Sequence, residues 1–174
     1  KVTFMIEIIS VRGIDIYQKN FSQVLLRGKD SNQLKQYIKD ETNLEMPTKN
    51  LNIIANENFL IGQHSFDQWS LIYLQEAEHQ KILKIVSNIN QNEDLLASDY
   101  SYGQVYFEIT GDKKDYYLNK LTHFDLRLKK FENLSLAQTL VARIDCTIYK
   151  LDKKYLITCN KSFEDYFKKR LLDA

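Results

Sequence analysis

The chain has 174 residues, 44% of them hydrophobic, which is enough to bury a core as one domain or as two halves that share one core. Its 24 basic and 23 acidic residues leave a net charge of +1, so the composition gives no whole-chain case for binding nucleic acid or an anionic membrane. No apolar run approaches the roughly 20 residues that span a bilayer, and two cysteines give no disulfide framework, so we expect a cytoplasmic protein.

Strand and helix patterns alternate from the start of the sequence. Residues 2–10 and 21–27 have the apolar character of strands, and the second strand ends at Gly28. Asp30 or Ser31 can then cap a helix. The apolar positions of that helix follow i, i+3, i+4 spacing and are Leu34, Tyr37 and Ile38.

A hairpin, a strand and a second helix complete the first half. Residues 51–62 predict a hairpin that turns at 56–58, and residues 68–74 predict a further strand. Residues 75–89 predict a helix. Its inward positions are Ile82, Ile85, Val86 and Ile89.

The same order returns after a polar stretch at residues 88–101, which is the natural seam of the chain. Residues 103–110 predict a strand that ends at Gly111, and residues 112–121 predict a helix. The inward positions of this helix are Tyr117, Leu118 and Leu121.

Two strands and a helix end the sequence. Residues 137–150 and 154–159 predict strands joined by a tight turn at 151–153. This hairpin places Cys146 opposite Cys159, and we expect two small, buried, reduced thiols. Ser162 opens the last helix, with Asp165 as its capping-box partner. The expected buried stripe of that helix is Phe163, Tyr166, Phe167 and Leu171.

The repeated order indicates an internal duplication. Gly28 corresponds to Gly111, and residues 69–73 correspond to residues 154–158. We therefore predict an α+β fold, built twice from strands, helix, strands and helix, with pseudo-twofold symmetry. It forms a single compact domain, 1–174, made of repeats at about 1–92 and 93–174. Because neither repeat has enough core alone, we expect the N-terminal strand of each to pair with the other repeat.

Candidate catalytic and metal-binding pairs each have a plainer interpretation. Glu76 and His79 have a helical spacing that can bind metal, but an exposed polar pair is favoured because no second copy occurs. His64 and Asp67 could act as acid and base, yet no nucleophile accompanies them, so turn residues are favoured. The stretch 123–125 fits a turn after a helix, with its phenylalanine packed inward.

Phosphate and base binding are also weakly supported. Gly28 and Gly111 precede helices but belong to no glycine-rich phosphate-binding pattern. Several tyrosines could stack bases, but without a basic stripe they are better interpreted as strand and interface aromatics. These are Tyr100, Tyr102, Tyr106, Tyr116 and Tyr117. No catalytic, cofactor-binding or metal-binding residue is assigned from the pattern.

Several short motifs follow one another along the chain in an order that is typical of one family. A strand ends in Arg-Gly at Gly28, a Met-Pro pair follows the first helix at residues 46–47, and a turn and strand carry Asp67 and Trp69. In the second half the motif positions are Gly103, Gly111, Asp125, Leu126, Gln138, Thr139, Ser162 and Phe163. Over roughly residues 7–174 this order resembles the gamma subunit of heterotetrameric sarcosine oxidase. That subunit shares its fold with the folate-binding domain of aminomethyltransferase, the T-protein of the glycine cleavage system.

The resemblance implies a role without catalysis in this chain. Sarcosine oxidase, an enzyme of sarcosine catabolism, oxidatively demethylates its substrate and passes the methyl carbon to tetrahydrofolate. A sister complex could act on a related N-methyl amine. The flavins and NAD belong to the alpha and beta subunits and zinc to delta, so this chain is expected to hold no cofactor and to dock on alpha. Tyr100 and Tyr102 are candidates for that docking surface.

A freestanding folate-binding or aminomethyl-transfer protein is the alternative. Such a protein needs a carboxylate that projects into a central cavity, to hold the pterin or to activate the amine. The carboxylates available for this are Asp67, Asp99 and Asp125, although each fits a turn.

Overall fold

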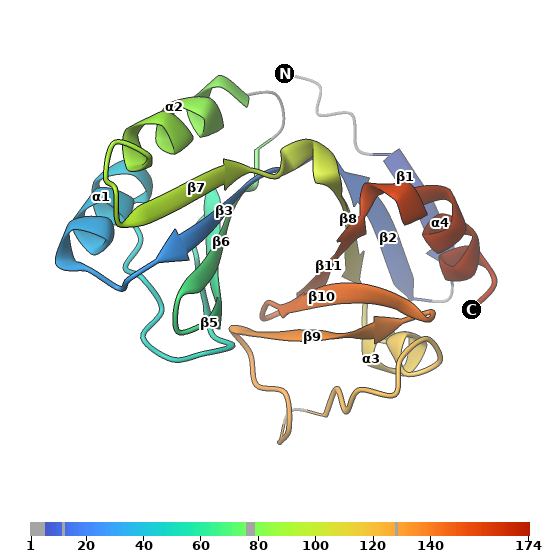
Figure 1. Cartoon of the computed structure of the whole chain (residues 1–174). Helices are drawn as coiled ribbons and strands as arrows, with labels where there is room; N and C mark the ends of the chain where they lie inside the picture. The colour runs from blue at the N-terminus through green and yellow to red at the C-terminus, as the bar shows by residue number, and fades with distance from the viewer. Residues whose placement is uncertain (1–5, 12, 76–78, 128) are drawn as a thin grey trace. The chain divides into compact units, whose positions relative to one another are not determined.

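The computed structural model describes residues 6–11, 13–75, 79–127 and 129–174 (Figure 1). The chain divides into two compact units, Phe21–Tyr102 and a second unit made of Lys1–Asn20 with Gly103–Ala174. Within these described ranges, each unit combines an antiparallel sheet with two α-helices, so the α+β class is confirmed. Among the described residues, no helix has the length and apolar character needed to cross a membrane.

The unit Phe21–Tyr102 is built on a five-stranded sheet in the order β4-β5-β6-β3-β7. Helices α1 and α2 supply apolar side chains to one core, which includes Leu34, Ile38, Trp69, Ile82 and Ile85. The elements in chain order are β3 (Ser22–Gly28), α1 (Asn32–Thr42), β4 (Ile53–Ala55), β5 (Phe59–Ser65), β6 (Gln68–Tyr73), α2 (His79–Ile89) and β7 (Leu95–Asp99).

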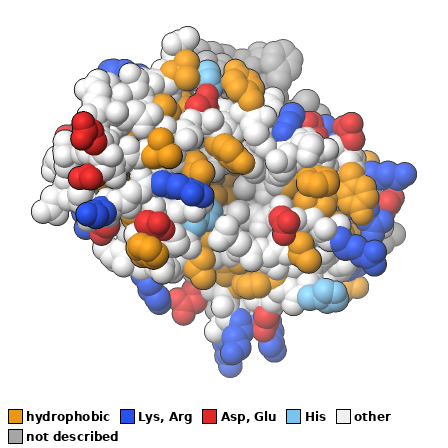
Figure 2. Space-filling view, viewed as in Figure 1, with side chains coloured by type: hydrophobic (Ala, Val, Ile, Leu, Met, Phe, Trp, Pro, Cys, Tyr) orange, Lys and Arg blue, Asp and Glu red, His pale blue; other side chains and the backbone are white. Residues whose placement is uncertain are grey.

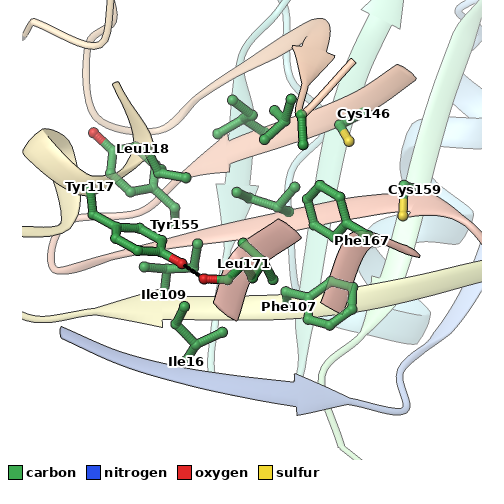
Figure 3. Close-up of a cluster of buried hydrophobic side chains, with 14 of the residues drawn as sticks. Ile16, Phe107, Ile109, Tyr117, Leu118, Cys146, Tyr155, Cys159, Phe167 and Leu171 are labelled. Carbon is green, nitrogen blue, oxygen red and sulfur yellow. Dashed lines mark hydrogen bonds between the residues drawn. The ribbon is translucent and has the colours of Figure 1, made fainter. Parts of the chain in front are cut away.

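The other unit is built on a six-stranded sheet in the order β1-β2-β8-β11-β10-β9. Its elements are β1 (Ile6–Val11), β2 (Ile14–Lys19), β8 (Gln104–Thr110), α3 (Lys114–Leu118), β9 (Ser135–Val141), β10 (Ile144–Lys150), β11 (Lys154–Asn160) and α4 (Glu164–Leu172). Short 3₁₀ turns, η1 (Ser101–Gly103) and η2 (Lys161–Phe163), precede β8 and α4. Figure 3 shows the core of this unit, in which Phe107 meets Phe167 and the Tyr117 hydroxyl donates a hydrogen bond to the main-chain oxygen of Leu171.

The two sheets follow one plan, as the duplication predicts. The order β7-β3-β6-β5-β4 in one sheet matches β2-β8-β11-β10-β9 in the other, and β1 is the additional strand. The helices also occur at matching places in the chain, since α1 follows β3 as α3 follows β8, and α2 follows β6 as α4 follows β11. The expectation that the two units form one domain stays a prediction.

The alignment of the repeats differs by one residue from the expected one. In one sheet Arg27 pairs with Gln68, and in the other Thr110 pairs with Lys154. Counted from the two glycines, Gln68 therefore corresponds to Lys154, and Trp69 corresponds to Tyr155. Both aromatic residues are fully buried in their cores, whereas the expected match of Trp69 with Lys154 would place an apolar side chain on a polar position.

Two strands that the sequence pattern did not show complete the sheets. β2, from the first repeat, pairs with β8, and β7, from the second repeat, pairs with β3. The repeats therefore do exchange strands, but β1, the expected N-terminal strand, pairs with β2 of its own repeat. The stretch 88–101 is not simply a polar seam, because it contains β7.

Gly28 and Gly111 occupy the same position in the two sheets, as expected. Both have positive φ, at 141° and 102°, which L-residues with side chains rarely adopt. A Cβ on Gly28 would lie 2.5 Å from the main-chain oxygen of Asp94, and a Cβ on Gly111 would meet the backbone of Gly13. The glycines thus allow the ends of β3 and β8 to pass close to the backbone that leads into the neighbouring strand.

The segment 137–150 was expected to be one strand, and this prediction was wrong. It contains the end of β9 and the whole of β10, joined at Ala142 and Arg143. These two residues have positive φ values of 51° and 68°, the conformation of a two-residue type I′ hairpin turn. The usual Asn-Gly signal for this turn is missing from the sequence, so the strands looked continuous.

Of the two helix caps predicted from the sequence, one is found in the structure and the other is not. Ser31 caps α1, because its Oγ accepts a hydrogen bond from the Leu34 amide at 3.1 Å. Before α4, the Asn160 side chain caps η2 by accepting from the Ser162 amide at 2.9 Å. The N-cap residue of α4 itself is Phe163, which forms no side-chain cap, so the expected box of Ser162 with Asp165 does not form. Phe167 and Leu171 are buried as predicted, whereas Phe163 and Tyr166 are 47% and 48% exposed.

Candidate functional site

Asp67 lies in the turn between β5 and β6 and is held there by its neighbours. Its carboxylate accepts a hydrogen bond from the Ser65 hydroxyl at 2.6 Å, and its main-chain oxygen accepts from the Gly28 amide at 3.0 Å. His64, the proposed base partner, instead contacts the Ser70 hydroxyl through Nε2 at 2.9 Å. Burial lowers the pKa of His64 to about 4, so the ring is neutral near pH 7. The turn interpretation of Asp67 therefore fits the structure better than an acid–base pair.

Asp99 lies at the end of β7 and organises the turn that follows. One carboxylate oxygen accepts from the hydroxyl and the amide of Ser101, at 2.6 and 3.0 Å. The other oxygen is 3.1 Å from Nε2 of His79, whose ring also packs against Tyr102 with 5.1 Å between centroids. Of the proposed pair Glu76 and His79, the first residue lies outside the described residues.

Asp125 and Leu126 lie in the loop between α3 and β9, beyond the turn at residues 119–121 that follows α3. Arg127 donates hydrogen bonds to both carboxylate oxygens of Asp125, at 2.8 and 2.6 Å for the closest pairs. These bonds lower the pKa of Asp125 to about 2. Leu126 is buried in the core, and Phe124 packs against it partly buried, as expected for a turn with an inward phenylalanine.

The remaining motif positions divide between core and surface. Trp69 is fully buried in the core of its unit, and Gly103 ends η1 at the start of β8. Gln138 is exposed and Thr139 half-buried on β9, while Ser162 and Phe163 are exposed before α4. Within the described residues, no group of three or more His, Cys, Asp or Glu side chains could hold a metal ion.

The two cysteines are neighbours across the β10–β11 hairpin, as the register argument predicts. Cys146 pairs with Cys159, and both are free and buried (Figure 3). The hydrogen bond with Cys159 and burial both raise the pKa of the Cys146 thiol. A thiol that stays protonated is a poor nucleophile, so Cys146 suits core packing rather than catalysis.

A polar pocket on the sheet of the second unit is the candidate binding site. Ile144, Cys146 and Ile148 of β10 point into the helix-covered core, so Asp145 and Thr147 lie on the opposite face. The pocket on this face has a volume of about 640 Å³. It is lined by Gln104, Gln138, Thr139, Leu140, Asp145, Cys146, Thr147, Thr158 and Asn160.

The chemistry of the polar pocket favours hydrogen bonding over catalysis. Its lining offers amide and hydroxyl groups with one carboxylate, that of Asp145. Thr158 donates a hydrogen bond to the Gln104 side chain at 2.9 Å. Gln138 and Thr139 had been noted as motif positions with no binding role assigned, and Asp145 was missed, since an isolated aspartate within an apparently continuous strand gives no signal.

Lys150 is a buried amine that the sequence also did not indicate. It is only 6% exposed, and its Nζ donates to the main-chain oxygens of Leu126 and Phe131, at 3.1 and 2.7 Å. The amine also lies over the rings of Phe131 and Tyr155. Burial lowers its pKa. Because both acceptors are in the loop between α3 and β9, Lys150 fixes that loop rather than presenting a nucleophile.

The fold is that of aminomethyltransferase-like structures. Aminomethyltransferase T of the glycine cleavage system from Bartonella henselae has a TM-score of 0.60 and 9% sequence identity, over 88% of this chain and 43% of that chain. The regulatory subunit of aspartate kinase from Thermus thermophilus, in its ligand-free form, has a TM-score of 0.50 and 8% identity, over 91% and 95% of the two chains.

A more extensive similarity is found to one particular assembly. A chain of heterotetrameric sarcosine oxidase from Corynebacterium sp. U-96, in complex with pyrrole 2-carboxylate, has a TM-score of 0.80 and 16% identity. The alignment covers 96% of this chain and 86% of that chain. No family model and no curated protein sequence matches the chain, so the likeness is one of fold.

Proposed function

We propose that the chain is a non-catalytic structural subunit, of the gamma type, in a heterotetrameric complex of the sarcosine oxidase kind. The complex would oxidatively demethylate sarcosine or a related N-methyl amine in the cytoplasm and pass the methyl carbon to tetrahydrofolate. The observation that carries this proposal is the structural likeness to a chain of such a complex, because it extends over nearly the whole length of both chains.

Each of the three candidate carboxylates already has a hydrogen-bond or ion-pair partner within the chain, which supports a role without catalysis. Asp67 is bonded to Ser65, Asp99 to Ser101 and His79, and Asp125 to Arg127. A general base must be free to reach its substrate, whereas these groups already stabilise turns. In the proposed complex the flavins, NAD, tetrahydrofolate and zinc belong to the partner subunits, which are of the alpha, beta and delta type.

A subunit that acts by association needs a docking surface, and β7 with η1 provides the candidate. Leu96, Tyr100 and Tyr102 are 54%, 40% and 79% exposed in this short stretch. Hydrogen bonds to the main chain of Gln23 hold the stretch in place. The main-chain N–H of Gln23 donates to the Ser101 hydroxyl, and its main-chain oxygen accepts from the main-chain N–H of Tyr100. Rigid aromatic side chains contribute strongly to protein interfaces, so we propose this surface for the contact with the alpha-type subunit.

The alternative is a freestanding folate-binding or aminomethyl-transfer protein. The likeness to aminomethyltransferase T favours it, as does the polar pocket. In that case Asp145, rather than the three carboxylates expected from the sequence, is the candidate to bind a polar heterocycle, because it is the carboxylate that lines the pocket.

Co-purification tests the proposal directly. The chain is expressed together with subunits of the alpha, beta and delta type, and the eluted complex is assayed for flavin absorbance and for peroxide formed from sarcosine. We expect Tyr102→Ser to weaken the association. Tyr116→Ser is the matched control, since Tyr116 is also strongly exposed, at 68%, but lies on α3. An isolated chain that makes peroxide alone, or binds folate tightly without partners and loses this binding in Asp145→Asn, would contradict the subunit role.

A further inference from the structure

A second pocket, which we call the basic pocket, lies where three segments of the second unit meet. It has a volume of about 500 Å³. The segments are the chain after α3, the β9–β10 turn and the outer face of α4. The lining residues are Asn119, Lys120, Leu121, Thr122, His123, Leu140, Ala142, Arg143, Tyr166 and Arg170.

The floor of the basic pocket is fixed by hydrogen bonds between the first two segments. The Ala142 amide donates to the main-chain oxygen of Leu121 at 2.7 Å, and the Thr122 hydroxyl donates to that of Leu140, also at 2.7 Å. Thr122 and Ala142 are both buried. The floor therefore joins the β9–β10 turn to the chain after α3.

Cationic side chains surround this floor. Arg143 occupies the second position of the type I′ turn with φ of 68°, so its exposed side chain projects from the tip of the hairpin. Tyr166 and Arg170 lie one helical turn apart on α4, which places them on the same face. Lys120 and His123 approach from the segment after α3, and both are exposed. Figure 2 shows Lys and Arg side chains gathered on the right of the molecule, where Figure 1 places α4.

The charge of the basic pocket is partly compensated, since Lys120 donates a hydrogen bond to the main-chain oxygen of Ala174 at 2.6 Å. None of the lining residues is acidic, although the whole chain is nearly neutral. Within the described residues, neither Arg143 nor His123 forms an ion pair. Arg170 is 3.6 Å from the carboxylate of Asp173, but both side chains are about half exposed, and such surface pairs are weak. A ligand with two or more negative oxygens can therefore compete for these guanidinium groups.

We propose that the basic pocket binds a small polyvalent oxyanion, a phosphate ester or a polycarboxylate. Arg143 and Arg170 would donate to the anionic oxygens, and the Tyr166 hydroxyl can add a further hydrogen bond. The apolar side chains of Leu121 and Leu140 suit a ligand that also carries a short carbon skeleton. This inference does not depend on the proposed subunit role.

Inorganic phosphate and citrate are the probes for the test. Amide resonances of the ¹⁵N-labelled chain are followed during titration with each anion at constant ionic strength, because screening changes the apparent affinity. We expect saturable shifts confined to residues 119–123, 140–143 and 166–170. Arg143→Gln and Arg170→Gln should each weaken binding about three- to fivefold, the range for a partly exposed charge contact.

The control variant removes charge outside the basic pocket, and it removes one positive charge more than either arginine variant. Lys153→Gln with Lys169→Gln loses two positive charges, and both lysines are exposed and absent from the pocket lining. We expect this double variant to bind phosphate and citrate within twofold of the unaltered chain, and circular dichroism should show all variants folded. Unsaturable shifts at lysines and arginines throughout the chain, equal losses in the control, or binding of a polyglutamate peptide without binding of either small anion would overturn the proposal.

Discussion

Replacing Gly111 by alanine tests the close approach of β8 to the β1–β2 turn. The new Cβ would overlap the main-chain oxygen of Gly13 and lie 2.8 Å from its carbonyl carbon, closer than Cβ atoms essentially ever come to backbone. Its distance of 3.0 Å to the Cα of Ile14 is also tighter than most Cβ contacts. The φ of 102° adds a conformational cost of about 1–2 kcal/mol for a residue with a side chain. Overlap with backbone that cannot move away adds about 1–3 kcal/mol.

A matched substitution separates the two costs. Gly13 has a φ of 84°, but a Cβ there would meet nothing within 4 Å. Gly13→Ala therefore carries the conformational cost alone, offset by about 0.4–1 kcal/mol because alanine restricts the unfolded chain. We expect Gly111→Ala to lower the free energy of unfolding by about 2–4 kcal/mol and Gly13→Ala by about 1 kcal/mol or less.

Urea denaturation followed by circular dichroism measures this difference. With a slope of about 1–3 kcal/mol per molar urea, typical of small proteins, the midpoint of Gly111→Ala should fall by about 1 M or more. The midpoint of Gly13→Ala should change by less than half of that. If Gly111→Ala is no less stable than Gly13→Ala, the backbone contact is not what requires glycine at this position.

Three further predictions concern buried and charged groups. Lys150→Met should destabilise the fold by about 2–4 kcal/mol in urea unfolding, since two buried main-chain oxygens lose their donor; an unchanged midpoint would contradict the structural role of the amine. The ring of His64 should stay neutral down to about pH 4 in an NMR titration, and protonation near pH 6.5 would refute this. Because the unfolded chain binds this proton at a higher pH than the folded chain, the contribution of His64 to the free energy of unfolding should decline as pH falls from about 6.5 to 4. Burial opposes ionisation of Glu164, but hydrogen bonds from Lys161, Lys168 and Gln18 outweigh it and lower the pKa to about 2. Glu164→Gln should therefore reduce the loss of stability between about pH 4.5 and 2, and an identical loss in the variant would exclude the effect.

The spacing of apolar residues predicted correctly those elements that bury one face and expose the other. The helix with Ile82, Ile85 and Ile89 has its apolar face inward as expected, and the hairpin around residues 56–58 turns where the polar residues lie. There the Asn56 side chain accepts from the Asn58 and Phe59 amides. In both cases neighbouring residues decide the structure, so local pattern was sufficient.

The elements that were missed depend on distant residues. β2 reads Ile-Asp-Ile-Tyr-Gln-Lys and β7 reads Leu-Leu-Ala-Ser-Asp, and neither is strongly apolar. Each becomes a strand by pairing with β8 or β3, whose positions only the folded chain brings near. Polar side chains of these strands also find specific partners, as when Gln18 donates to the carboxylate of Glu164 at 2.7 Å.

The two pockets could not be predicted from the sequence for a related reason, because their residues come from distant parts of the chain. Gln104, Gln138 and Asp145 come from three strands, and Arg143 and Arg170 come from a turn and a helix. Their proximity follows from the register of β8 to β11 and from the unexpected turn at Ala142. No spacing along the chain marks either set.

The strand exchange has a consequence for how the protein is made on the ribosome. The unit Phe21–Tyr102 is continuous in sequence, so β3 can acquire β6 and then β7 as soon as each leaves the exit tunnel. β2 must wait for β8, which is synthesised only after that whole unit. During this interval one edge of the β1–β2 hairpin is unpaired, and unpaired edges invite association with other nascent chains. Slow translation through residues 21–102 would lengthen this exposure, whereas rapid arrival of β8 would end it.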